Sequence, residues 1–529
     1  MADRADANNS DWKKRESLPS ALIQIVIVGA LLAAAVWFVV GRGNRKKEIG
    51  DKLKEAKIVA IKDNPADLKK AIGMAEEILQ LDSTAPEVLA TLATLHTQLW
   101  LVHREPGHDA KAKEYLEKAE KAESKSEDRY GTKALHILAS GKAKEAEDFI
   151  EELRKKGAST AKLAYAQALA LKAQNNLQLA RAAFVLASDK GWKDPQYASA
   201  FAESWLEEGQ QLNALDYFNK AMSNNPDHLR SKVGIALARI ERKDRVADAA
   251  ETLKDLLGRE AELSPALKAR VYATTAELAN FEAQYDQAIA GADKALSINP
   301  DDPWAHFVKA KALALKKDAA APAAFTATVT KATSAPAFYF EGAMLLQQAG
   351  MTNDALALLD KYENVMKPIQ NPTADGKTQA FLDRDDRYWL TRGDVLRDAG
   401  KLDDALAAYD KAIAAKNVNL VKATYAKGSV FLAKKEYDKA AEQLVDITPP
   451  DGTGALAEAY MAMGEIQFSK KDWAAGCQSY AYALSKLKAQ SVPREQLNAM
   501  LTDVEKKLIS AGQKPVAKLW VDEAKPLIQ

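Results

Sequence analysis

The sequence predicts an all-α protein built as a solenoid of repeated helix pairs. Two sets of alanines keep one spacing of 34 residues: Ala134, Ala168 and Ala202, then Ala146, Ala180 and Ala214. Two sets of small residues that follow one period indicate a structural repeat in which each unit contacts only its neighbours. The composition agrees, because a hydrophobic share of 47% with only 7% aromatic residues is typical of helices that pack through small side chains.

Charge and cysteine content exclude several classes of site. The 74 basic and 73 acidic residues almost cancel and form no long block of one sign, so nothing in the sequence favours a nucleic-acid partner. Cys477 is the only cysteine, so neither an intramolecular disulfide nor a paired-cysteine zinc site can form. We therefore expect stability to come from packing.

Residues 1–18 are predicted to form a short N-terminal tail, and residues 19–41 a single transmembrane helix. In the 20 residues from Ala21 to Val40, Gln24 is the only clearly polar side chain. At about 1.5 Å per residue this segment measures roughly 30 Å, which is the thickness of a hydrocarbon core. A cleaved signal peptide is the alternative, and it is less favoured because the apolar run is too long.

The side of the membrane that holds the repeats is only weakly indicated. Basic residues flank the predicted span on both sides, with an excess after it, which favours a cytoplasmic repeat domain. Large domains cross membranes largely regardless of charge, however, and a short N-terminus before one span is typical of a bacterial signal anchor. We expect an inner-membrane protein with a single N-terminal span, and we favour a periplasmic over a cytoplasmic repeat domain.

The rest of the chain divides into four predicted parts. Residues 42–125 form a linker and degenerate N-terminal repeats, residues 126–335 and 336–490 the two halves of the repeat array, and residues 491–529 C-terminal capping helices. The two clearest units begin at Pro195 and near Trp389, with small residues where helices cross and aromatic residues between them. The predicted packing residues, besides the six alanines above, are Phe218, Ala221, Trp389, Gly393, Ala405, Tyr409 and Ala412.

This pattern resembles the tetratricopeptide repeat, and the whole chain looks like a single-pass, membrane-anchored bacterial protein of that family. The resemblance implies a right-handed superhelix of about ten or eleven helix-turn-helix units. The spacing fails at residues 316–322, 364–384 and 445–454, where we expect bends or insertions because prolines and glycines gather there.

No catalytic, cofactor or metal site is predicted. His96, His103 and His108 lie close in sequence, but no complete set of zinc ligands accompanies them, so we interpret them as packing or surface residues. Phosphate-binding glycine loops and nucleophile motifs are absent from the sequence. Cys477 follows a small packing position and is interpreted in the same way.

The resemblance implies that the first helix of each unit lines a concave, peptide-binding groove. The candidate groove residues are Phe340, Met344, Arg387, Asp394, Arg397, Lys422, Tyr425, Met461, Glu465 and Phe468. Their mixture of aromatic, methionine and charged groups suits a peptide, and the alternative that some of these side chains pack between units is left open. We therefore predict a membrane-anchored scaffold that binds proteins or peptides in envelope assembly or protein transport, with homo-oligomerisation left open.

Two other functions remain open. The irregular residues 364–384 could hold the site of an enzyme or of an enzyme accessory subunit, which turnover by the purified protein would reveal. An import receptor with its repeats facing the cytosol has a similar layout, although the asparagines that clamp chaperone tails in such repeats are missing from the matching positions of this chain.

Overall fold

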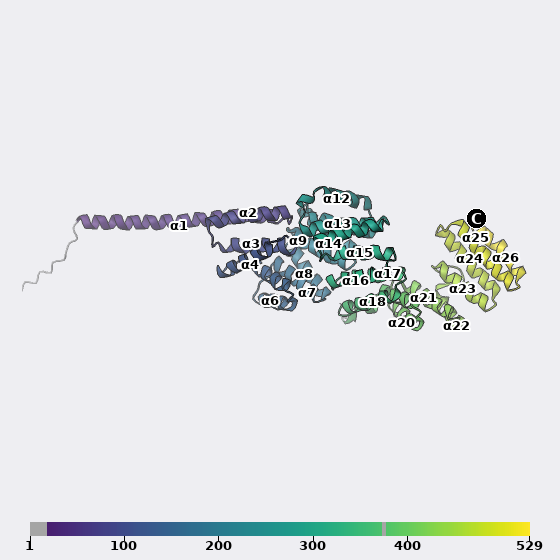
Figure 1. Ribbon diagram of the computed structural model, residues 1–529. Coiled ribbons are helices and arrows are strands. Elements are labelled where there is room, and N and C mark those ends of the chain that lie inside the picture. Colours follow the sequence, from purple (N-terminus) through teal and green to yellow (C-terminus); the bar gives the residue numbers. More distant parts are fainter. Residues whose placement is uncertain (1–17, 373–376, 529) are drawn as a thin grey trace, which may run out of the picture.

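The computed structural model of the protein describes residues 18–372 and 377–528, with side chains from Leu22 onward except at positions 35, 38, 41 and 372. Almost all of the predicted tail, and part of the irregular stretch 364–384, lie outside the described residues. Within them the chain is all-α, as predicted, with 26 α-helices and one two-stranded sheet (Figure 1).

The first half of the chain contains α1 (Leu18–Ala60), α2 (Pro65–Leu81), α3 (Pro86–Leu101), α4 (His108–Lys121), α5 (Asp128–Ala139), α6 (Ala143–Lys155), α7 (Ala161–Ala173), α8 (Leu177–Lys190), α9 (Pro195–Glu207), α10 (Gln211–Asn224), α11 (Leu229–Arg242), α12 (Val246–Gly258), η1 (Glu260–Glu262), α13 (Pro265–Phe281) and α14 (Tyr285–Ile298). The second half contains α15 (Pro303–Leu315), α16 (Ala321–Lys331), α17 (Pro336–Gln348), α18 (Thr352–Met366), β1 (Gln370–Pro372), β2 (Thr378–Ala380), η2 (Phe381–Arg384), α19 (Asp386–Asp398), α20 (Leu402–Ala414), α21 (Leu420–Ala433), α22 (Tyr437–Leu444), η3 (Val445–Ile447), α23 (Ala457–Ser469), α24 (Trp473–Ala489), α25 (Arg494–Ser510) and α26 (Lys514–Ile528).

Local sequence signals set the ends of these helices. Asp194 precedes the proline that begins α9, and its carboxylate accepts a hydrogen bond from the backbone N–H of Gln196 at 3.0 Å. Asp302 caps α15 in the same way, through the N–H of Ala305 at 2.9 Å. Aspartate satisfies the free N–H groups of a first turn, and proline lacks the N–H that would otherwise be unpaired there. Gly209, with φ of 72°, follows α9 in the left-handed conformation that glycine tolerates best.

Consecutive helices pack as antiparallel pairs, and the pairs stack on one another. Within the described residues, the helices from α3 to α24 form eleven such pairs, which agrees with the predicted ten or eleven units. The pair α1–α2 precedes them and α25–α26 follows. The solenoid therefore extends closer to both ends of the chain than the sequence pattern shows.

The predicted packing residues lie in the interior. Every alanine of the two registers is at most 2% exposed, and Phe218 and Tyr409 are fully buried. Gly393 faces the ring of Tyr409 so closely that a Cβ atom built on it would lie 2.6 Å from the ring's Cδ1. Small residues are therefore needed at these positions because the helices approach one another there.

Two stretches that the sequence marks as irregular have a simple structure. The first residues of the predicted part 42–125 are helical, because α1 continues without a break from Leu18 to Ala60. At residues 316–322, where the spacing of the repeat fails, the chain makes the turn between α15 and α16, and Pro322 lies in the first turn of α16, where its missing N–H costs nothing. At the irregular stretch 364–384, β1 pairs antiparallel with β2, with Asn371 opposite Gln379.

The N-terminal part of α1 projects away from the helix stack (Figure 1). Between Leu22 and Val40 its large apolar side chains with described positions are 52% to 79% exposed. Among the described residues, no helix combines the length and the apolar character that a membrane span needs.

Candidate functional site

The structure divides the predicted groove residues into exposed and buried groups. Phe340 and Phe468 are 1% and 7% exposed, so these two side chains pack between helices and offer no free surface for a peptide. Met344, by contrast, is 37% exposed. The burial of the two phenylalanines follows from the closeness of successive pairs, because a bulky side chain on a first helix can reach the neighbouring pair.

Three basic residues on α19 and α21 stay accessible. The guanidinium of Arg387 lies over the ring of Phe340, 4.2 Å from its centroid. Arg397 pairs with Asp394 at 3.1 Å, and Lys422 is exposed. We call Met344, Arg387, Arg397, Lys422 and Tyr425 the α17–α21 surface, since they lie on the first helices of three successive pairs that pack side by side.

Met461 and Glu465, the other two groove candidates on α23 besides Phe468, take part in contacts within the C-terminal pairs. Met461 packs against the apolar cluster formed with the C-terminal helices. Glu465 accepts a hydrogen bond from the hydroxyl of Tyr480 at 2.9 Å and pairs with Lys507 at 2.9 Å. These contacts hold α23 to α24 and α25, so both residues have structural partners already.

The three neighbouring histidines do not converge on one point. The Nδ1 atoms of His96 and His108 lie 2.6 Å apart, and the ring of His96 stacks on Tyr115. His103 instead pairs with Asp63, with its Nε2 3.7 Å from the carboxylate. Burial lowers the pKa of His96 to about 4, which favours its neutral form in this packed position. Among the described residues, no cluster of three or more candidate metal ligands is present.

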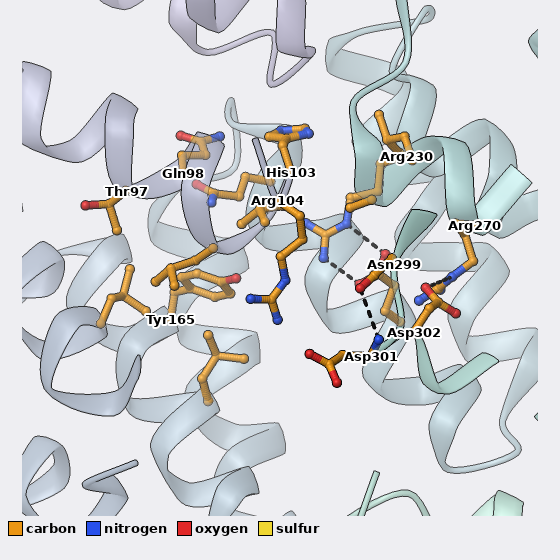
Figure 2. A pocket seen from close by; sticks show the side chains of 18 of the residues that line it. Thr97, Gln98, His103, Arg104, Tyr165, Arg230, Arg270, Asn299, Asp301 and Asp302 are labelled. Atoms are coloured by element: carbon orange, nitrogen blue, oxygen red, sulfur yellow. Dashed lines mark hydrogen bonds and ion pairs between the residues drawn. The ribbon is translucent and has the colours of Figure 1, made fainter. Parts of the chain in front are cut away.

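A cavity of about 330 Å³ lies inside the first part of the solenoid, and the sequence pattern does not single it out. The first helix of every pair from α3 to α15 contributes to its lining, together with the loops after α3 and α14. Figure 2 shows the polar side chains that point toward it. A site bordered by seven consecutive pairs can form only because the helix stack curves back on itself.

Contacts between distant loops close this curve. Asp63, in the loop after α1, is 1% exposed and accepts hydrogen bonds from Gln98 and from His228, the latter at 3.2 Å. Burial alone would raise the pKa of the Asp63 carboxyl, but His103 and His228 outweigh it and hold this pKa far below its usual value. The backbone oxygen of His103 also accepts a hydrogen bond from the N–H of Ala266 at 3.1 Å. The contacts of Asp63 with His228 and of His103 with Ala266 join residues more than 160 positions apart.

Ion pairs line the cavity wall. Arg230 donates to both oxygens of Glu203, at 2.7 and 2.5 Å, and Arg270 donates to Asp302 at 3.3 Å. Arg104, from the loop after α3, is exposed and has no ion-pair partner within the described part of the chain. In Figure 2 its guanidinium lies between Tyr165 and Asp301 in this view, and no dashed line reaches it.

The period of the repeat connects several of these residues. Lys162, Gln196 and Arg230 all line the cavity and lie 34 residues apart, at the second position of successive units. Glu203 occupies the ninth position of its unit, as Asp394 and Glu465 do in theirs. The 34-residue spacing is therefore the sequence signal that could have identified these residues. The sequence does not show how strongly the helix stack curves, however, so it does not reveal that these positions face one cavity.

A second polar cluster lies beyond the cavity. Lys311 on α15 contacts Glu277 on α13 and Glu241 on α11, the latter at 3.2 Å, and Glu341 on α17 lies near it. Burial raises the pKa of Glu277 to about 8 and that of Glu341 to about 7. One lysine cannot neutralise three carboxylates, so the cluster holds extra protons near neutral pH.

The chain is similar to solved structures at low sequence identity. Among solved structures, the chain is similar to the human IFIT1 dimer with PPP-AAAA, at 16% identity over 76% of this chain and 94% of that chain, with a TM-score of 0.42. It is similar to the APC/C hetero-tetramer Cut9-Hcn1 at 13% identity over 87% and 84% of the two chains, with a TM-score of 0.41. No curated protein matches the chain.

The family comparison concerns the region that carries four of the groove candidates. Residues 390–452 match the model of the tetratricopeptide repeat. This range covers most of α19 and all of α20, α21 and α22, with Asp394, Arg397, Lys422 and Tyr425 among its residues. Residues 390–452 are thus similar to the tetratricopeptide repeat, as their small and aromatic residues predict.

Proposed function

We propose that the protein is a binding scaffold that takes partner polypeptides on the α17–α21 surface. The observation that carries the proposal is the position of accessible basic, aromatic and methionine side chains on successive first helices, and three of these residues, Arg397, Lys422 and Tyr425, lie in the range 390–452 that matches a tetratricopeptide repeat. Repeat proteins of this kind generally work through an extended surface, because each unit adds a similar helix beside the last.

The chemistry of this surface favours a peptide with acidic and apolar residues. Arg387 and Lys422 have no carboxylate within ion-pair distance among the described residues, so acidic groups of a partner can reach them. Met344 is flexible and polarisable, which suits apolar side chains of differing shape. Arg387 already stacks on Phe340, and this contact fixes the direction of its guanidinium.

Charge reversal tests the proposal. We expect the double variant Arg387→Glu and Arg397→Glu to lose partners that the unaltered protein captures, because like charges then face the acidic groups. The matched control is Lys361→Glu, at an exposed position on the second helix α18. Quantitative mass spectrometry of captured proteins measures the loss, and circular dichroism checks the fold. Equal capture by all three proteins would refute the proposed surface.

Membrane anchoring and an envelope role form a second part of the proposal. Support comes from the exposed apolar side chains of Leu22 to Val40, which lie on a helix that projects from the body. An uncharged segment of that length favours a lipid environment over water. We favour a periplasmic repeat domain, and protease accessibility of residues 61–528 in sealed membranes measures its side.

Extraction experiments test the anchor itself. The unaltered protein is expected to stay in the membrane pellet at alkaline pH, whereas the variant Ile27→Lys and Leu31→Lys is released, since each charge in a lipid core costs about 2.5–3.5 kcal/mol. Ile58→Lys, on the same helix but outside the apolar segment, is the control. Release of the unaltered protein with alkaline carbonate would refute the anchor.

We propose binding, without catalysis, as the activity of the chain. The irregular region 364–384 that could have held an enzyme site contains a short hairpin, and the two residues that flank this region bond to each other, since Tyr362 donates to Asp385 at 2.9 Å. Burial raises the pKa of the Tyr362 hydroxyl far above its usual value, so it stays protonated and acts as a donor to Asp385. Metal-dependent or nucleotide-dependent turnover by the purified protein would contradict this part.

A further inference from the structure

In the cavity inside the first part of the solenoid, the acidic side chains of the lining all have ion-pair partners among the described residues, whereas some of its basic side chains do not. Four carboxylates line it, and each is paired with a basic side chain. Glu203 and Asp302 use Arg230 and Arg270, which also line the cavity. Glu207 and Asp301 use Lys172 and Lys331, which lie outside the lining.

Two cations of the lining therefore have no ion-pair partner within the residues that the structure describes: Arg104 and Lys162. Lys162 is 7% exposed, and its ammonium lies 5.9 Å from the centroid of the Tyr197 ring. The carboxyl of Asp194 is nearby, but burial raises the pKa of this group to about 7, so it is a weak counter-charge at neutral pH. An unpaired buried cation is costly, and an anion in the cavity would reduce that cost.

Unsatisfied polar atoms point to the same cavity. Gln196 is 2% exposed, and its Oε1 has no hydrogen-bond partner; Nη1 of Arg230 is also buried without one. Both side chains line the cavity. The amide of Gln196 can rotate to present its NH₂ group, so it can donate, as Arg230 can. Buried polar groups in native proteins nearly always have a partner, which here would be a ligand or water.

The size of the cavity limits the ligand. A volume of about 330 Å³ lies at the lower end of the range of roughly 300–1,000 Å³ that small-molecule sites occupy. Thr97 on α3 and Thr132 on α5 also line the wall, but their hydroxyls already donate to the backbone oxygens of Ala93 and Asp128, so the donors for a ligand come from the arginines, Lys162 and Gln196. The lining is thus suited to one compact polar group with several acceptor oxygens.

We propose that this cavity binds an oxyanion, the carboxylate or phosphate group of a small ligand or of a chain end, with Arg104 and Lys162 as its counter-charges. Arginine binds such groups through two parallel hydrogen bonds, and lysine adds a point charge. Nη1 of Arg230 and the amide of Gln196 supply further donors. This site is separate from the α17–α21 surface, and the proposal does not depend on partner binding there.

Calorimetry with defined probes tests the site. The full chain in detergent is titrated with inorganic pyrophosphate, with citrate, and with a short peptide whose C-terminus is either free or amidated. Pyrophosphate or citrate binding supports a free small oxyanion as the source. Binding of the free-carboxylate peptide but not of the amidated one supports a chain end. Failure of all four probes to bind at millimolar concentration would overturn the proposal.

Substitution then assigns the binding to the cavity. Arg104→Gln is expected to weaken binding about tenfold, the size of one lost charged hydrogen bond. Since Arg104 is exposed and holds no ion pair, the melting temperature should stay unchanged. Arg242→Gln, at an exposed arginine on α11 outside the cavity, is the matched control and should bind normally. Unchanged affinity in both Arg104→Gln and Lys162→Gln would overturn the assignment, whereas capture of protein partners tests only the α17–α21 surface.

Discussion

Replacing Gly393 with alanine tests whether close helix crossings require the small residues of the repeat. The added Cβ would lie 2.6 Å from Cδ1 of Tyr409, well inside van der Waals contact. Tyr409 is fully buried, and its hydroxyl donates to Asp394 at 2.8 Å, so the ring cannot move aside without breaking this bond. Overpacking of this kind costs about 1–3 kcal/mol.

A second glycine supplies the control. Gly73 lies within α2, and a Cβ there would meet no atom within 4 Å. Alanine stabilises a helix interior by about 1 kcal/mol relative to glycine, so Gly73→Ala should stabilise the protein by this amount. Gly393→Ala gains the same helix preference but also creates the clash. The two substitutions should therefore differ by about 1–3 kcal/mol in their effect, with Gly393→Ala the less stable.

Hydrogen exchange is the suitable assay because a long repeat array does not unfold in one cooperative step. Exchange of the amides in α19 and α20 gives the local opening free energy for Gly393→Ala, and exchange in α2 gives it for Gly73→Ala. Faster exchange around Gly393 and slower exchange around Gly73 are expected. If alanine slowed amide exchange equally around Gly393 and around Gly73, the claim that the helix crossing at Gly393 requires a residue without a Cβ atom would be refuted.

Three further predictions concern ionisable groups. Because burial raises the pKa of Glu277 to about 8 from 4.5, the folded chain binds more protons than the unfolded chain between these values. The local opening free energy of α13, measured by hydrogen exchange, should therefore fall as pH rises toward 8, and less steeply in Glu277→Gln; a flat profile in the unaltered protein would contradict this. The contacts of Asp63 lower its pKa from 3.8, so the stability that this carboxylate adds to the fold is present above that pH and is lost on acidification. Asp63→Asn should speed amide exchange at residues 225–229 at neutral pH, by an amount that corresponds to a loss of local stability on the order of 1–3 kcal/mol. Unchanged exchange would argue against the loop contact. Burial raises the pKa of the Cys477 thiol to about 11 from 9.0, so alkylation at neutral pH should be about a hundredfold slower than in the unfolded chain, and equal rates would show that the thiol is not shielded.

The sequence predicts the helix pairs well because their determinants are local. Prolines and aspartates begin helices, left-handed glycines follow them, and alanines repeat where the helices cross, so the spacing alone is enough to assign Ala202 and Ala405 to the interior. The sequence is less clear at the start of the predicted part 42–125, where a charged stretch after an apolar one resembles a linker; this stretch is helical up to Ala60, since lysine and glutamate are also good helix formers.

The cavity depends on information that one repeat does not contain. Its lining comes from seven successive first helices, and the angle between successive pairs decides whether Lys162 and Arg230 face the same space. Small rotations add up along the stack, so local propensities cannot give their sum. Phe340 and Phe468 are buried for a more local reason: neighbouring pairs lie so close that a bulky side chain on a first helix packs between them.

Site-specific photo-crosslinking tests the central claim, that partners bind the α17–α21 surface, most directly. A photoreactive residue is placed at Met344 on the first helix α17 and, in a separate protein, at Lys361 on the second helix α18. After irradiation in native membranes, the account predicts crosslinked partner proteins from position 344, lost when Arg387→Glu and Arg397→Glu are added, and none from position 361. Crosslinks from position 361 alone, or crosslinks at 344 that survive the charge reversal, would contradict it.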